Sequence, residues 1–401
     1  MKALRIHAGP VARQHLERHG LAPSHVRVIP AAAGGPKGLI LGPLDRFLFG
    51  DWLPQSDQPV DLVGASIGAW RMATACLQQP VAAFERLEHD YIHQAYDLAP
   101  GQKRPTAAHV SERFGQNLAL FYGGRVTELL QHPRYRLHIV TSRGRHLLGR
   151  EHRVATPLGY LGAFLTNTVH RKAMGAWLER VVFSSPEAGV AAPLPFATTD
   201  YRTRQVLLSE ANFMPALQAS CSIPFVLQAV HHIPGAPRGA YWDGGITDYH
   251  LHLQYRPRQA MGPNAPETIA AEADKTSTNG HFDQELQSAA GGAGADDAAQ
   301  GLVLYPHFQQ AVIPGWLDKG LRWRHRATSA LDRMVVLSPS AEWVASLPGG
   351  KLPDRTDFTR YGTDTAARVK AWSAATAASR QLADEFAQWL ARPDLSVVYP
   401  L

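Results

Sequence analysis

The feature that most constrains this chain is a glycine-rich loop directly after a buried strand. The apolar run Val26–Ile29 is typical of a strand, and residues 31–38 read AAAGGPKG. Apolar residues then follow at the 3.6-residue period of one helix face: Ile40, Leu44, Phe47 and Leu48. We expect this helix to begin near Leu39 or Ile40, because Pro43 is tolerated in the first turn of a helix. A strand, a tight loop and a helix in this order indicate an α/β protein.

Short β-branched runs alternate with helical patterns along the rest of the chain, which predicts a sheet covered by helices on both faces. The strand candidates are Val26–Ile29, Val60–Val63, Arg136–Thr141, Val206–Leu208, Ala240–Trp242, Leu302–Tyr305 and Met334–Leu337. A terminal amphipathic helix is indicated by Leu382, Phe386, Trp389 and Leu390. The apolar segment Leu158–Val182 carries scattered basic residues and fits a lid, a lipid-contacting helix or an ordinary core helix, of which we prefer the last.

The length of the chain and the change of composition at residues 256–300 limit how it can be divided into domains. A chain of 401 residues exceeds the usual single domain, and we favour one large α/β domain with an insertion over two domains. Residues 256–300 are small and polar, which predicts a flexible low-complexity insertion. The core then comprises residues 1–255, and residues 301–401 form an α/β completion of the same domain.

Composition excludes several classes of protein. Hydrophobic residues make up 45% of the chain, but no apolar stretch is long enough to span a bilayer, and the first residues lack the pattern of a secretion signal. The expected compartment is therefore the cytoplasm. Two cysteines, Cys76 and Cys221, are too few for a disulfide scaffold or a four-cysteine zinc site, and we expect both to be buried.

The net charge of +6 raises the question of an anionic partner. The arginines are scattered, and the modest basic cluster at residues 322–326 is best interpreted as a solvated surface. We find no nucleic-acid module and expect no nucleic-acid partner. Peripheral contact with an anionic membrane remains compatible with the charge.

A second motif, GxSxG, follows the strand candidate Val60–Val63 and precedes a helix-compatible run. Gly64, Ser66 and Gly68 occupy its fixed positions. This is the setting of a nucleophile elbow, in which a sharp strand-to-helix turn holds the serine in a strained conformation and its hydroxyl projects into a cleft. The amides at the start of the following helix can donate to an anion.

The glycine-rich loop now has a chemical interpretation. Acyl transfer places negative charge on the substrate oxygen, and backbone amides in a loop with few side chains can stabilise that oxygen. The candidate oxyanion-hole donors are the amides of Gly34, Gly35, Lys37, Gly38 and Ile67. Pro36 has no N–H to donate. A phosphate-binding loop is disfavoured, because Lys37 lacks the GxxxxGK spacing and no serine or threonine follows it. A plain strand-to-helix connection stays open.

A third motif lies far along the chain, where Asp243 ends a strand-like run and is followed by Gly244 and Gly245. With this piece the chain resembles the patatin-like phospholipase family, which has an oxyanion loop GGGx[KR]G, a GxSxG elbow and a distant DG[GA]. The counterparts here are residues 33–38, 64–68 and 243–245, in the family's order. Residues 219–230, ASCSIPFVLQAV, also resemble the family's stretch ahead of the aspartate.

This resemblance implies a three-layer α/β/α fold with a mainly parallel central sheet, a catalytic core at residues 1–255, and hydrolysis of lipid or other acyl esters without a cofactor or metal. Ser66 would attack the ester carbonyl and Asp243 would accept its proton, while Lys37 would fix the loop. The chain departs from the family pattern at Ala33, which replaces the first loop glycine. It also has Tyr249 and Leu251 where an asparagine and a proline are common, which bears on acyl-chain preference.

Three other functions remain open. An ordinary α/β-hydrolase would pair Ser66 with an acid and a later histidine, for which His250, His252 and His307 are candidates. The short gap between the loop and the elbow, and the two glycines after Asp243, disfavour this triad. Asp248, His250 and His252 are a possible fragment of a metal site. The last alternative is a catalytically inactive interaction protein of patatin-like shape.

Overall fold

The computed structural model describes residues 1–96, 102, 105–257 and 301–401. The expected insertion, but for residues 256 and 257, lies outside these ranges. The strands of the main sheet are β1 (Leu4–Ala8), β2 (Val26–Ala31), β3 (Val60–Ala65), β4 (Tyr135–Gly144), β5 (Leu178–Ser184), β8 (Thr203–Leu207), β9 (Val230–His231), β10 (Ala240–Asp243), β11 (Leu302–Pro306), β12 (Met334–Pro339) and β13 (Val398–Pro400). Strands β6 (Pro186–Glu187) and β7 (Val190–Ala191) form a separate hairpin.

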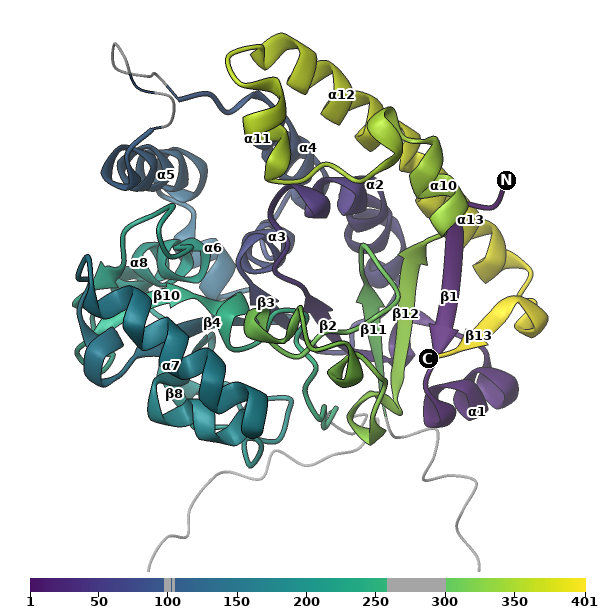
Figure 1. The fold of residues 1–401 in the computed structure, drawn as a ribbon. Helices are drawn as coiled ribbons and strands as arrows, with labels where there is room; N and C mark the ends of the chain where they lie inside the picture. The colour runs from purple at the N-terminus through teal and green to yellow at the C-terminus, as the bar shows by residue number, and fades with distance from the viewer. Residues whose placement is uncertain (97–101, 103–104, 258–300) are drawn as a thin grey trace, which may run out of the picture.

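The sheet runs in the order β13-β1-β12-β11-β2-β3-β4-β10-β9, and β5 and β8 continue from β4. The central strands β12, β11, β2, β3 and β4 are parallel to one another, whereas β1 and β10 join antiparallel. Strands before residue 255 and after residue 301 therefore share one sheet (Figure 1). The predicted α/β fold with a mainly parallel sheet flanked by helices is confirmed.

The longer helices surround this sheet (Figure 1). They are α1 (Pro10–His19), α3 (Ile67–Ala75), α4 (Pro80–His93), α5 (Ala107–Tyr122), α7 (Ala155–Val169), α8 (Glu210–Cys221), α12 (Thr365–Ala378) and α13 (Arg380–Ala391). Shorter ones are α2 (Gly42–Arg46), α6 (Val126–Leu130), α10 (Ala341–Ser346) and α11 (Thr356–Tyr361). The predicted terminal helix is confirmed as α13, whose Leu382, Phe386 and Trp389 are buried.

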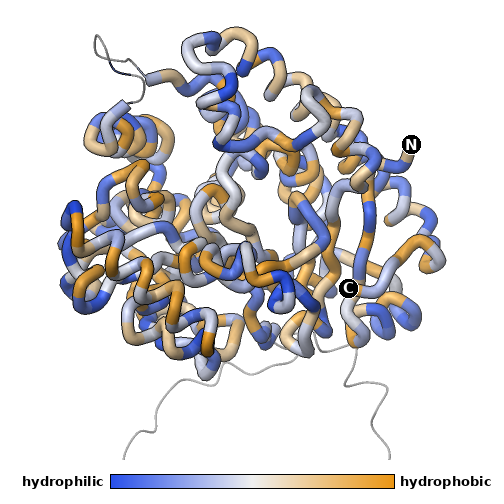
Figure 2. Tube along the Cα trace, viewed as in Figure 1, coloured by the Kyte–Doolittle hydropathy of each residue, from blue (hydrophilic) through white to orange (hydrophobic). Residues whose placement is uncertain are grey.

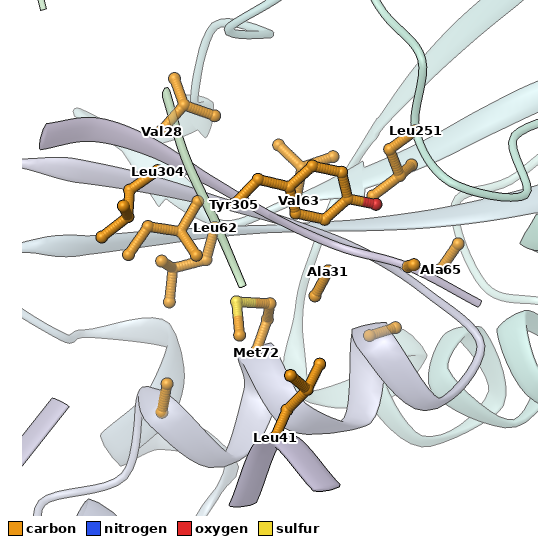
Figure 3. Close-up of a cluster of buried hydrophobic side chains, with 14 of the residues drawn as sticks. Val28, Ala31, Leu41, Leu62, Val63, Ala65, Met72, Leu251, Leu304 and Tyr305 are labelled. Carbon is orange, nitrogen blue, oxygen red and sulfur yellow. The ribbon is translucent and has the colours of Figure 1, made fainter. Parts of the chain in front are cut away.

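Both faces of the central strands are covered by apolar side chains. Figure 3 shows Met72 of α3 and Leu41 together on one side of the strands and Leu251 on the other, and all three are buried. Strands β2 and β3 are buried along their whole length. This is the expected state of a parallel strand between two layers, and it explains why these strands read as continuous apolar runs.

The structure corrects three local predictions. Leu158–Val182 is not one helix: α7 ends at Val169, and β5 begins at Leu178. The helix after the glycine loop starts later than expected, because residues Gly35–Leu41 form a 3₁₀ helix and α2 begins at Gly42. Arg324, which we expected on a solvated surface, is bonded to Asp318 at 2.8 Å.

Two other expectations concern the cysteines and the membrane. Cys76 and Cys221 are both free and buried, as predicted. In the described ranges, none of the helices combines the length and the apolar character that crossing a bilayer requires.

Candidate active site

The registers of β3 and β10 bring two sequence motifs together. Both strands pair with β4. Strand β5 pairs with the same stretch of β4 and occupies one of its two edges, so β3 and β10 both lie along the other edge. Ala65 at the end of β3 lies opposite Val140, and Asp243 at the end of β10 lies opposite Thr141. Because β3 is parallel and β10 antiparallel to β4, their C-terminal ends face each other. The residue after β3 is Ser66.

Ser66 occupies the strained turn that the GxSxG pattern predicts. Its backbone has φ 57° and ψ −129°, a region that non-glycine residues rarely adopt. The turn is possible because Gly68 has no side chain: a Cβ there would lie 1.9 Å from the carbonyl oxygen of Ala31. Gly64 is likewise packed against the backbone of Ala69.

The elbow is also held by a serine from α8. The N–H of Ser66 donates to Oγ of Ser220 at 2.9 Å, and this hydroxyl donates to the carbonyl oxygen of Val140 at 2.7 Å. Ser220 is fully buried. It therefore ties the strained turn to the middle of the sheet.

The Ser66 hydroxyl donates to Oδ2 of Asp243 at 2.6 Å, and the N–H of Gly245 donates to Oδ1 of the same carboxyl group at 2.7 Å. Ser66 is 3% exposed and Asp243 5%. Burial raises the pKa of Asp243, against the opposing effects of the Ser66 hydrogen bond and of Arg355. A raised pKa makes a carboxylate a stronger base, and the hydrogen bond places it where it can take the serine proton.

The two glycines after Asp243 allow close packing on both sides. A Cβ on Gly244 would lie 2.1 Å from the Val140 carbonyl oxygen, and one on Gly245 would lie 2.5 Å from Cβ of Ala33. The loop that carries the aspartate is thus pressed between β4 and the start of the glycine-rich loop.

The glycine-rich loop lies against both motifs. The N–H of Ala33 donates to the carbonyl oxygen of Tyr249 at 3.0 Å, and a Cβ on Gly38 would lie 3.2 Å from the side chain of Ile67. Gly35 has φ +57°, the left-handed conformation that glycine adopts without strain.

The backbone N–H groups of the loop differ in their availability. Those of Gly34 and Gly35 precede the first hydrogen bond of the 3₁₀ helix, and the N–H of Ile67 opens α3. Within the described ranges these three have no hydrogen-bond acceptor. The N–H groups of Lys37 and Gly38 lie inside the 3₁₀ helix, whose own hydrogen bonds use them.

A small hollow opens beside the aspartate. Its apolar wall includes Ile223 and Pro224, and its charged groups are Asp243, Lys319 and Arg355. A second small hollow is lined by Gly38 of the glycine-rich loop, by Ile67 and Arg71 of α3, and by Leu87 and Tyr91 of α4.

The histidines of the alternative triad have other partners. Nδ1 of His250 lies 3.1 Å from both the Ala311 carbonyl oxygen and the Ile313 nitrogen and bonds one of them, and the ring nitrogens of His252 bond the Val312 carbonyl oxygen and the Thr328 hydroxyl. His307 accepts from the Gln309 N–H. Asp248, the acidic member of the suggested metal fragment, holds the buried Arg180 at 2.6 and 2.7 Å. The described residues contain no group of three side chains placed to ligate a metal.

The fold and this site define a class: α/β proteins that carry a serine at a strained strand-to-helix turn, with a carboxylate and free backbone amides beside it. The Patatin-like phospholipase family model matches residues 33–250, more than half of the chain, and the chain belongs to this family. Comparison with curated proteins and with solved structures finds no match.

The sequence missed three residues that the structure adds to the site. Ser220 sits within the stretch that resembles the family, but nothing in the sequence showed that its hydroxyl would receive the Ser66 N–H. Lys319 and Arg355 lie beyond the family match, and no motif marks them.

Proposed function

We propose that this protein is a lipid acyl hydrolase that cleaves carboxylic esters with Ser66 as nucleophile and Asp243 as base. The observation that carries the proposal is the 2.6 Å hydrogen bond between the two side chains at the strained turn. Membership of the family supports a lipid substrate.

The chemistry follows from the positions of these groups. Asp243 accepts the hydroxyl proton as Ser66 Oγ attacks the ester carbonyl, and the negative charge on the carbonyl oxygen is met by the amides of Gly34, Gly35 and Ile67. The alcohol leaves with a proton from Asp243. Water then hydrolyses the acyl-enzyme, and Asp243 acts as base again.

The test compares p-nitrophenyl esters of increasing chain length and a mixed phospholipid substrate. Ser66→Ala and Asp243→Asn should each lower kcat by about 1,000-fold or more, because neither the nucleophile nor the base can be replaced. Asp57→Asn removes an exposed carboxylate just ahead of β3, at the end of the strand away from Ser66; it is the control and should keep the wild-type rate. His250→Ala, His252→Ala and His307→Ala should leave the reaction chemistry intact. An inactive wild-type protein would favour the interaction protein, and full activity in either site variant would remove the Ser–Asp mechanism.

The proposal includes binding of the protein to the surface of an anionic membrane, where its lipid substrate lies. The outer face of α7 exposes Leu158, Leu161 and Leu165 by 54 to 55% of their surface. Figure 2 shows apolar residues recurring along this helix. Exposed Phe225 continues the face, with its ring 6.1 Å from that of Tyr160, and it directly follows the hollow-lining Pro224.

Positive charge lies at both ends of this apolar face. Arg150 and Arg153 are exposed before α7, and Lys172 is exposed after it. An apolar stripe between basic residues matches a membrane with anionic headgroups. The predicted cytoplasmic location stays a prediction.

Vesicle sedimentation tests this surface. Leu158→Ser with Leu161→Ser should reduce binding to phosphatidylglycerol vesicles, whereas Leu120→Ser, at a leucine on α5 that is even more exposed, should not. Vesicles of phosphatidylcholine should bind less protein than phosphatidylglycerol vesicles. Equal binding by all variants would refute the assignment of this face.

A further inference from the structure

Two cations share the hollow beside the aspartate, and neither is held in an ion pair by a described residue. Lys319 and Arg355 both line the hollow that contains Asp243. Within the described ranges neither forms an ion pair, and the acidic neighbour of Arg355, Asp354, is already paired with Lys351 at 2.9 Å. Asp243 uses both carboxylate oxygens for Ser66 and Gly245. The positive charge is therefore available to a ligand.

Aromatic rings hold the Lys319 ammonium in this position. Its Nζ lies 3.9 Å from the centroid of the Tyr249 ring and 5.7 Å from that of Trp316. Tyr249 is also bonded to the glycine-rich loop through its carbonyl oxygen, so the ammonium is fixed relative to the site.

Arg355 lies against the same loop. A Cβ on Gly35 would lie 3.3 Å from its Nε, so the Arg355 side chain passes close beside Gly35. Lys37 adds a third positive charge nearby. Burial, and after it the charges of Arg355 and Lys37, lower the pKa of Lys319 to about 8, although Asp243 acts in the opposite direction. Such a lowering is the expected response of a cation that is partly buried and lies near like charges.

We propose that Lys319 and Arg355 form an anion subsite, which selects acyl esters carrying a negatively charged group close to the ester bond. This inference rests on the proposed hydrolase function and names the substrate class of the same site. The shared chemistry is a phosphate on the alcohol side or a carboxylate on the acyl side. Both residues lie outside the matched family segment, so the selectivity belongs to this chain's C-terminal part.

The experiment measures kcat/KM for three esters whose acyl groups have the same short length: a monoacylglycerol phosphate, the uncharged monoacylglycerol, and the glycerol monoester of succinic acid, whose free carboxylate lies close to the ester bond. Lys319→Gln and Arg355→Gln should each lower kcat/KM for an anionic ester by about 10-fold or more, the usual effect of losing a charged hydrogen bond. The value for the uncharged ester should change by less than about 3-fold. Lys370→Gln, which removes an exposed charge on α12, is the matched control and should change neither value.

The pattern across the three esters decides the result. A selective loss on the phosphate ester supports a headgroup subsite, and a selective loss on the dicarboxylic ester supports an acyl-end subsite. An equal loss on all three, or none on any, overturns the anion subsite while leaving the hydrolase intact.

A failure of the proposed function gives a different pattern. In that case the wild type hydrolyses none of the esters. Calorimetric titration with glycerol 3-phosphate then tests the subsite alone: weaker binding in both glutamine variants supports it, and equal or undetectable binding refutes it.

Discussion

A substitution at Ser220 can distinguish a loss of stability from a loss of the geometry of the turn that carries Ser66, the proposed nucleophile. In Ser220→Ala the N–H of Ser66 loses its acceptor at a position that is closed to water. A buried donor left without a partner costs about 1–3 kcal/mol of the free energy of unfolding. The same change releases a strained backbone, and a displacement of about 1 Å in a nucleophile lowers the rate by about 100-fold.

The chain contains a matched control for this substitution. The hydroxyl of Ser185 accepts the N–H of Leu137 at 3.0 Å and is also buried, so Ser185→Ala removes the same kind of bond. Leu137 lies opposite Leu62, three residues before the end of β3 and roughly 10 Å from the turn. The two variants should therefore lose similar stability.

Urea unfolding and ester hydrolysis together test the reasoning. Both variants should unfold at lower urea, but only Ser220→Ala should lose kcat, by about 10- to 100-fold, with little change in KM. Wild-type kcat in Ser220→Ala, or equal loss of kcat in both variants, would show that the hydrogen bond does not position the nucleophile.

Three further outcomes are expected. Gly68→Ala should abolish activity and impair folding, since its Cβ would meet the Ala31 carbonyl oxygen at 1.9 Å, whereas Gly320→Ala, in open space, should match wild type by circular dichroism and rate. Because burial raises the pKa of Asp243 and its ionised form is the base, the rate on an uncharged ester should fall as pH drops through a pKa above the ordinary aspartate value; a pH-rate profile that stays flat down to that value would contradict this. Because the pKa of Lys319 is about 8, kcat/KM for a phosphate ester relative to the uncharged ester should fall above that pH, and Lys319→Gln should remove this fall. The groups that face the Lys319 ammonium are Arg355, Lys37, Asp243, Tyr249 and Trp316.

The sequence predicted the elements whose signal is local. Strands β2 and β3 lie between two covering layers, so their apolar runs are visible without knowledge of the fold. The turn at Ser66 has an equally local cause, because its glycines are required by contacts within the strand-turn-helix unit and with the preceding strand. The structure brings Ser66 and Asp243 together as the motif order implied.

What the sequence could not show depends on partners far along the chain. Strand β5 was read as helix because its buried Glu179 and Arg180 do not resemble a strand interior. Arg143 forms a hydrogen bond with Glu179, and Arg180 forms hydrogen bonds with Asp248 and Asp200. The cost of burying these two charged side chains is therefore offset only once the sheet has folded and brought their partners close. The lipid-contacting interpretation of α7 was ranked below a core helix for a related reason: periodicity reveals an apolar stripe but not what covers it.

The site divides into parts with different structural origins. The distance between Ser66 and Asp243 follows from two registers on β4, since β3 and β10 end at the adjacent positions Val140 and Thr141. Sheet registers change only in whole residues, and a slip of one residue would reverse every side chain of the strand. The cationic edge, by contrast, is carried by segments of residues 301–401 that join the site through loops. Substitutions in those loops should therefore alter which esters are accepted while the serine and the aspartate remain in place.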